Sequence, residues 1–161
     1  MNILFKKLAK MPTIIVGFLL TGSFFGSAYV PHILGVVLFF VIYMIWILTI
    51  CSVIHDVNNP KPSLLFKLFV FNIFYSILYI FFDSMFNEWF IFSDKAISSF
   101  LGLYYVFSII YCILFVSREL VMAEGEPNPP FNRYLGSMLL IFIFPIGVWF
   151  IQSRVRKVLV N

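Results

Sequence analysis

One stretch of the chain decides its class: residues 33–54 read ILGVVLFFVIYMIWILTICSVI, an apolar run without acidic or basic side chains. A helix needs about 20 predominantly apolar residues to cross the hydrocarbon core of a bilayer, so the run predicts a transmembrane helix. The whole chain agrees, because 62% of its 161 residues are hydrophobic and only 11% are charged. Soluble domains carry about 25% charged residues. We therefore expect an all-α integral membrane protein.

Further apolar segments accompany this run, within what we expect to be a single membrane domain covering residues 1–161. The apolar segments are residues 12–30, 33–54, 64–82, 96–116 and 135–151. The second, third and fourth are long enough to span the bilayer. The first follows the basic residues Lys6, Lys7 and Lys10 and resembles an uncleaved signal-anchor helix. A tight hairpin at residues 29–32, which include Pro31-His32, is expected to separate it from the second.

The last apolar segment is short and is interrupted at Pro145-Ile146-Gly147. Proline removes a helix hydrogen bond, and glycine permits a sharp turn. The expected fold is four transmembrane helices plus a short C-terminal re-entrant or kinked fifth segment. The alternative is five spanning helices. A re-entrant segment must be shielded by protein, because lipid cannot satisfy its freed backbone groups.

The distribution of basic residues favours the arrangement with four crossings. If the fifth segment enters and leaves on one side, the 11 Lys and Arg residues divide ten to one, with Lys95 alone outside. Five crossings would divide them seven to four. Because cytoplasmic loops carry the excess of basic residues, we expect the N-terminus in the cytoplasm and Trp89 at the outer interface. The predicted location is a bacterial inner membrane.

Two apolar segments carry polar residues at helical spacing. Asn72, Ser76 and Tyr79 share one helix face in the third segment, and Tyr105 and Ser108 share one in the fourth. We expect this intramembrane polar stripe to lie inside a bundle, where interhelical hydrogen bonds contribute about 0.6 kcal/mol each. The alternative is a polar pathway for an ion or a small solute.

The first segment contains small residues at a spacing that lets helices approach closely. They form one Gly-x-x-x-Gly pair and a Ser pair shifted by one position: Gly22, Gly26, Ser23 and Ser27. We expect them to pack against the second segment, or against a helix of a partner.

A basic cluster closes the chain. Arg154, Arg156 and Lys157 follow Trp149, which is typical of an interfacial anchor. Anionic lipid attracts each such charge by about 1 kcal/mol. We expect these residues to contact lipid or, alternatively, an acidic partner.

Chemical motifs are sparse. Cys51 and His55 are one helical turn apart and Asp56 follows, but zinc sites usually use at least three protein ligands. No local cluster supplies them, and both Cys51 and Cys112 lie in apolar runs, where cysteine behaves as a small hydrophobe. We therefore expect no catalytic residue, no metal and no cofactor. Farther on, Gly125 is expected to end a helix that continues the fourth segment.

Residues 144–155 read FPIGVWFIQSRV. This run resembles the closing segment of small, uncharacterised bacterial inner-membrane proteins, which end in a Phe-Pro-Ile-Gly-Ile-Trp-Phe-Ile-Gln-Pro-Arg string after a Tyr-x-Gly entry. Tyr134-Leu135-Gly136 is compatible with that entry, whereas Ser153 stands where the string has proline. The resemblance brings no activity and implies only a bacterial inner-membrane location.

From these features we expect a non-catalytic, multi-pass membrane subunit that packs against, assembles or regulates a larger bacterial membrane complex. The alternative is a homo-oligomeric pore or transporter for an ion or small solute. A third hypothesis is a membrane-embedded enzyme that uses Cys51, His55 and Asp56. The expected partners are membrane lipids and other integral membrane subunits or copies of this chain, and not nucleic acid.

Overall fold

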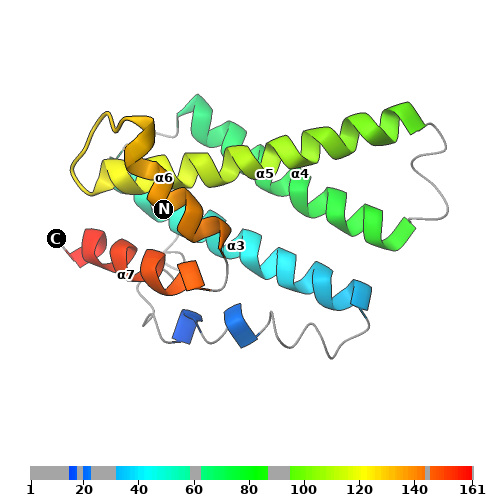
Figure 1. Cartoon of the computed structure of the whole chain (residues 1–161), viewed down its shortest axis with the longest axis horizontal. Helices are drawn as coiled ribbons and strands as arrows, with labels where there is room; N and C mark the ends of the chain where they lie inside the picture. Colours follow the sequence, from blue (N-terminus) through cyan, green and yellow to red (C-terminus); the bar gives the residue numbers. More distant parts are fainter. Residues whose placement is uncertain are drawn as a thin grey trace.

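The structure is a computed structural model that describes residues 15–17, 20–22, 32–58, 63–86, 95–143 and 146–160. Over these residues the regular structure is all helical (Figure 1). The longer helices are α3 (His32–Asn58), α4 (Leu64–Phe86), α5 (Lys95–Ala123), α6 (Phe131–Phe142) and α7 (Ile146–Val160). Residues 15–17 and 20–22 are also helical. The expectation of an all-α fold is therefore confirmed.

Three of these helices are long and apolar enough to cross a bilayer. Their candidate spans are Leu34–Asn58, Leu64–Ser84 and Ile97–Ala123. They correspond to the predicted second, third and fourth segments and extend several residues beyond the predicted C-terminal ends. The chain is thus a multi-pass membrane protein by the length and composition of α3, α4 and α5. Of the predicted first segment, only residues 15–17 and 20–22 lie within the described residues.

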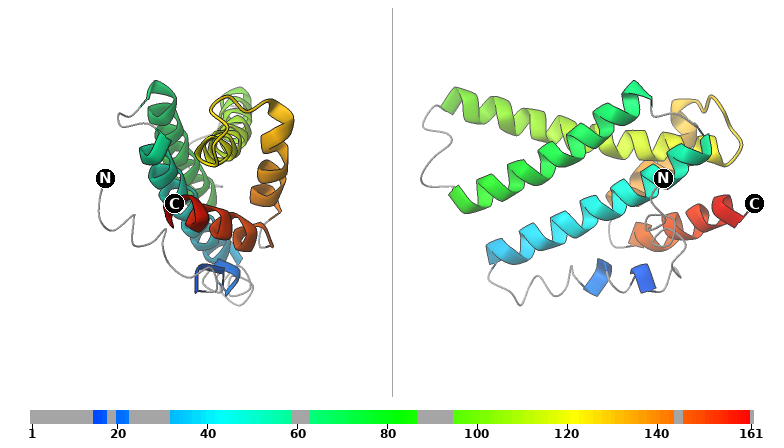
Figure 2. Two further views of the ribbon diagram at one scale, coloured as in Figure 1. Left: turned by 90° about the vertical axis from the view of Figure 1, so that its left-hand side faces the viewer. Right: turned by 180° about the vertical axis from the view of Figure 1, so that it is seen from behind.

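The core of the bundle lies around α3, which packs against α4, α5 and α7. Met44, Ile47, Ile50 and Ile54 of α3 are each 1% exposed or less. Figures 1 and 2 show α6 and α7 confined to the end of the bundle where α3 and α5 end and α4 begins. Outer faces of α4 and α5 remain exposed and apolar.

A glycine ends α5, as its position in the sequence predicted. Gly125 has φ +106, a conformation that costs L-residues with a side chain about 1–2 kcal/mol. The Gly125 N–H donates to the Met122 carbonyl at 3.1 Å, and the Glu126 N–H donates to the Val121 carbonyl at 3.4 Å. This pair of bonds is a Schellman motif, which satisfies carbonyls at the helix end.

The interrupted last segment forms two helices. α6 ends at Phe142 and α7 begins at Ile146, with 12 and 15 residues respectively. At a rise of about 1.5 Å per residue, each is about 18–23 Å long and shorter than the ~30 Å hydrocarbon core. A Cβ at Gly147 would fall on the carbonyl group of Leu140. Only glycine therefore allows α7 to begin so close to the backbone of α6.

Side chains of α3 supply hydrogen bonds to this interrupted segment. The Ile141 carbonyl would normally accept the N–H of residue 145, but that residue is proline and has none. The Tyr43 hydroxyl donates to the Ile141 carbonyl instead, at 2.7 Å. Nearby, Trp46 Nε1 donates to Gln152 Oε1 at 3.3 Å. α3 thus provides the polar partners that lipid cannot.

We expect Tyr43→Phe to lower the free energy of unfolding by about 1–3 kcal/mol, because the buried Ile141 carbonyl would lose its donor. Reversible unfolding in detergent measures this change. Tyr75→Phe is the matched control, since its hydroxyl donates at 2.9 Å to the Leu101 carbonyl inside the continuous helix α5. That carbonyl keeps its helical donor, so the control should cost less. Equal losses for both variants would contradict this account of the break.

Candidate functional site

The polar stripe joins α4 to α5. Ser76 and Ser108 are fully buried and Asn72 is 4% exposed. Ser108 Oγ donates to the Asn72 carbonyl at 2.9 Å, so the Ser76 hydroxyl is the donor in its 3.0 Å contact with Ser108 Oγ. Tyr104 OH donates to Asn72 Oδ1 at 3.1 Å. These polar side chains bond to one another across the helix interface.

The tyrosines of the stripe form an aromatic cluster beside it. The rings of Tyr79 and Tyr105 stack with centroids 4.6 Å apart and an interplanar angle of 22°. Tyr75 meets Tyr104 edge to face, also at 4.6 Å. Sequence spacing singled out Tyr79 and Tyr105, but Tyr104 makes the hydrogen bond to Asn72. Tyr104 lies close enough to the same face of α5 to have been included.

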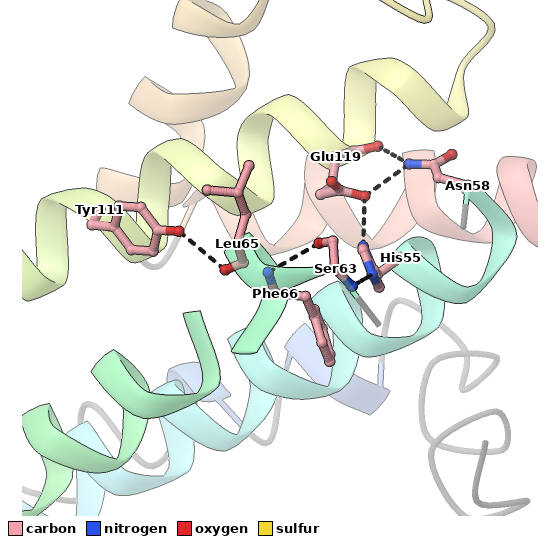
Figure 3. Close-up of polar contacts among 7 residues, drawn as sticks. All are labelled: His55, Asn58, Ser63, Leu65, Phe66, Tyr111 and Glu119. Carbon is pink, nitrogen blue, oxygen red and sulfur yellow. Dashed lines mark hydrogen bonds and ion pairs between the residues drawn. The ribbon is translucent and has the colours of Figure 1, made fainter. Parts of the chain in front are cut away.

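A second polar cluster lies where α3 and α5 end and α4 begins (Figure 3). His55 and Asn58 belong to the end of α3, Ser63 directly precedes α4, and Glu119 lies one turn before the end of α5. We call these four residues the polar junction. His55 is 1% exposed and Glu119 is 3% exposed, so both are withdrawn from solvent and from lipid.

Hydrogen bonds of the polar junction indicate which tautomer a neutral His55 ring adopts. The Ser63 backbone N–H lies 3.4 Å from His55 Nε2, so that nitrogen is the acceptor. The proton of a neutral ring is then on Nδ1, which lies 3.3 Å from Glu119 Oε2. The same Glu119 oxygen accepts from Asn58 Nδ2 at 3.0 Å. Asn58 Nδ2 also donates to the Glu119 carbonyl at 3.0 Å.

The polar junction also builds the first turn of α4. Ser63 Oγ accepts the Phe66 N–H at 3.1 Å, as an N-cap does, and the Ser63 carbonyl accepts the Lys67 N–H at 3.1 Å. The Phe66 ring stacks on the His55 ring with centroids 4.3 Å apart. Tyr111 of α5 donates to the Leu65 carbonyl at 3.0 Å. Together these contacts hold the ends of three helices.

The polar junction does not bring together all three residues of the enzyme hypothesis, Cys51, His55 and Asp56. Cys51 is fully buried and has a free thiol, whereas Asp56 is exposed, so the three residues of the enzyme hypothesis do not face one another. Among the described residues, no group of three or more His, Cys, Asp or Glu side chains is placed to hold a metal ion. Buried side-chain nitrogen and oxygen atoms in this part of the chain all have hydrogen-bond partners.

The pairing of His55 with Glu119 is absent from the sequence-based expectations. The two residues are 64 positions apart, so no local motif reveals them. The sequence indicates this pairing only indirectly. His55 and Glu119 each lie near the C-terminal end of a predicted helix, and both of these ends are on the same side of the membrane in either predicted topology. A buried carboxyl group near a membrane surface needs a donor, and His55 is a donor at that level.

The basic cluster at the end of the chain divides into two parts. Arg154 Nε donates to Glu124 Oε1 at 2.7 Å, and its Nη2 pairs with the other oxygen. Arg154 Nη1 donates to Ser137 Oγ at 2.6 Å. Arg156 and Lys157 are exposed. The three residues therefore differ: Arg154 is held by Glu124 and by Ser137 of α6, whereas contact of Arg156 and Lys157 with lipid or a partner stays a prediction.

Trp149 contacts the protein as well. An added Cβ at Gly17 would lie 2.6 Å from two Trp149 ring carbons, so the indole packs directly on this glycine. Trp149 is thus partly covered by the protein, and its expected role as an anchor in the lipid interface stays a prediction. The close approach depends on Gly17, which the Gly-x-x-x-Gly pattern did not include.

The predicted small-residue motif is only partly within the described residues. Gly22 is exposed, and no atom lies within 4 Å of a Cβ built on it. In this chain Gly22 therefore makes no close helix contact with the described residues. Ser23, Gly26 and Ser27 lie outside the described residues.

Comparison of the chain with protein-family models, curated proteins and solved structures finds no match. By the length and composition of α3, α4 and α5, the chain is a helical, multi-pass membrane protein, and its last apolar segment is divided into α6 and α7.

We expect Glu119→Leu to destabilise the chain by about 1–3 kcal/mol, because the buried His55 Nδ1–H loses its acceptor, whereas Asn58 Nδ2 keeps the Glu119 carbonyl. Glu119→Gln keeps an acceptor oxygen and should cost less. The control is Glu126→Leu, because Glu126 pairs with Arg133 at 3.8 Å in an exposed position, where ion pairs contribute about 0–1 kcal/mol. Unfolding of the three variants in detergent checks this order. A loss for Glu119→Leu no larger than that for Glu126→Leu would contradict the role of the polar junction.

Proposed function

We propose that the chain is a non-catalytic, multi-pass subunit of a bacterial inner-membrane complex, and that it acts by packing against another integral membrane protein. The observation that carries this proposal is the division of polar and apolar side chains. Polar groups of α3, α4 and α5 bond to one another inside the bundle, as the contact of Ser76 with Ser108 and that of His55 with Glu119 illustrate. The outward-facing apolar side chains of these helices are therefore available to pack against a partner.

The outer faces of α4 and α5 are the proposed docking surface. Large aromatic side chains there are more than half exposed: Phe71, Phe74, Phe100 and Phe107. Aromatic side chains bury about 150–250 Å² each when they are covered. Because helices associate in membranes through van der Waals packing rather than through a hydrophobic driving force, such a surface offers extensive contact to a partner helix.

The proposed topology has four crossings, with both termini in the cytoplasm and α6 and α7 forming a re-entrant hairpin. Two contacts support it. Tyr43, near the middle of α3, contacts Ile141 close to the break. Arg154, near the end of α7, contacts Glu124 just after α5. The hairpin thus reaches the middle of the bundle and returns to the end from which it started. In this proposal the remaining crossing is the predicted first segment, residues 12–30.

A reporter that is active only in the periplasm, fused after residue 161, tests this topology. We expect no activity there, and activity when the reporter is inserted between residues 86 and 95. The ten-to-one division of basic residues gives the physical reason. Activity after residue 161 would contradict the re-entrant hairpin and restore the alternative with five crossings.

The alternative function, a homo-oligomeric pore or transporter, is favoured by one observation. Discontinuous membrane helices often form transport sites. The last apolar segment is discontinuous in this way, because α6 ends at Phe142 and α7 begins at Ile146. However, Tyr43 and Trp46 of α3 bond directly to this region, and the polar side chains of the stripe bond to one another. These contacts favour a role in packing.

Site-specific photocrosslinking in native membranes tests the subunit proposal. A photoreactive amino acid at Phe74 or Phe107 should crosslink to a different integral membrane protein, because both side chains are more than half exposed on the proposed surface. The matched control is Ile45, which is 48% exposed but lies on α3, and it should crosslink less.

The other outcomes of this experiment are informative. Crosslinks only between copies of the chain, in a closed oligomer, would favour the pore or transporter. Adducts with lipid alone at Phe74 and Phe107 would overturn the proposed docking surface.

A further inference from the structure

Helix α7 has two contrasting faces. Val148, Ile151 and Val155 are each 1% exposed or less and pack into the core. On the opposite side, Phe150 is 57% exposed, and Lys157 is exposed as well. Their spacing of seven residues places both on one face of the helix. Arg154 lies between them on this face and is bound by Glu124 and Ser137, but the Phe150 and Lys157 side chains remain exposed.

The charges on α7 are not balanced within the protein. Glu124 pairs with Arg154, and Glu126 pairs with Arg133. Glu119 is occupied by the polar junction. Among the described residues, Arg156 and Lys157 form no ion pair with a carboxylate, and both are exposed. Two adjacent positive charges therefore remain available at the end of the chain.

Apolar and basic groups are ordered along the axis of α7. Lys157 lies on the same face as Phe150, whereas Arg156 lies about 100° further round the helix, at the edge of this face. Phe150 lies close to the break, one turn after the helix begins, and the two basic residues lie near its other end. At the rise of an α-helix, six or seven residues correspond to about 9–11 Å. The basic end passes the level of Glu124, where α5 leaves the bundle.

We infer that this face of α7 binds one anionic phospholipid, with the headgroup phosphate at Arg156 and Lys157 and an acyl chain along Phe150. A phospholipid matches this face both in charge and in the order of its groups along the membrane normal. It carries its negative charge at the membrane surface and its apolar chains below. The inference uses the proposed cytoplasmic position of this end and is independent of the subunit role. Arg154 is excluded from the lipid site, because it binds Glu124 and Ser137.

Native mass spectrometry of the full chain, purified in detergent and supplied with phosphatidylglycerol, measures the fraction with one bound lipid. Each basic residue near a membrane surface contributes about a fivefold factor to the attraction of anionic lipid. Arg156→Gln with Lys157→Gln should therefore weaken binding by roughly 30-fold, and added salt should weaken binding to the unmutated chain. Phe150→Ala should also reduce binding. Phosphatidylcholine should bind less than phosphatidylglycerol.

The control variant removes two other charges from the same end of the bundle. Lys67 is exposed on α4, and the Arg133 side chain is 66% exposed. Lys67→Gln with Arg133→Gln should leave lipid binding unchanged. The charge-conserving pair Arg156→Lys with Lys157→Arg should retain binding, which separates loss of charge from loss of folding.

Three results would overturn the lipid site. Equal losses for the two double glutamine variants would show attraction by net charge alone. Equal binding of phosphatidylcholine and phosphatidylglycerol would remove the headgroup contact. If Arg156→Gln with Lys157→Gln releases a co-purifying protein while lipid binding stays unchanged, this face binds an acidic protein instead. Photocrosslinking at Phe74 and Phe107 is unaffected by each of these results, so the two proposals can fail separately.

Discussion

Hydrocarbon offers no hydrogen bonds to a broken helix, and the rest of this structure depends on how that constraint is met. The helix breaks between Phe142 and Ile146, and the proline at position 145 has no N–H for the Ile141 carbonyl. Tyr43 supplies the missing donor from the centre of α3. This requires α3 to lie against the hairpin as well as against α4 and α5, which makes it the central helix.

Polar contacts then occur at two levels of the bundle. The stripe around Asn72 joins α4 to α5 within the apolar region, while the polar junction around His55 joins three helix ends near the membrane surface. In both places each polar group has a partner in the protein, which avoids the cost of exposing it to lipid. The outer faces of α4 and α5 can therefore carry many exposed apolar side chains, as the proposed packing against a partner would use.

The apolar runs at 33–54, 64–82 and 96–116 were sufficient to predict α3, α4 and α5, because length and hydrophobicity alone define a spanning helix. The break at Pro145 was also predictable, since it follows from the covalent structure of proline. The pairings of Arg154 with Glu124 and of Trp149 with Gly17 were not. Both depend on which face of α7 turns inward, and apolar residues on both sides of that helix hide its orientation. The pairing of His55 with Glu119 likewise depends on how the helix ends converge.

The contact between Tyr43 and Ile141 also has a consequence for biosynthesis. Its two residues are 98 positions apart, and ribosomes add about 5–20 residues per second. The acceptor therefore emerges roughly 5–20 seconds after its donor. During this interval α3 is already made, and the surface that will receive α6 and α7 is still open to the surrounding bilayer. α6 and α7 can therefore reach α3 only after α3, α4 and α5 have been made. Insertion factors or neighbouring proteins have a defined period in which to contact that side of α3 before α6 and α7 cover it.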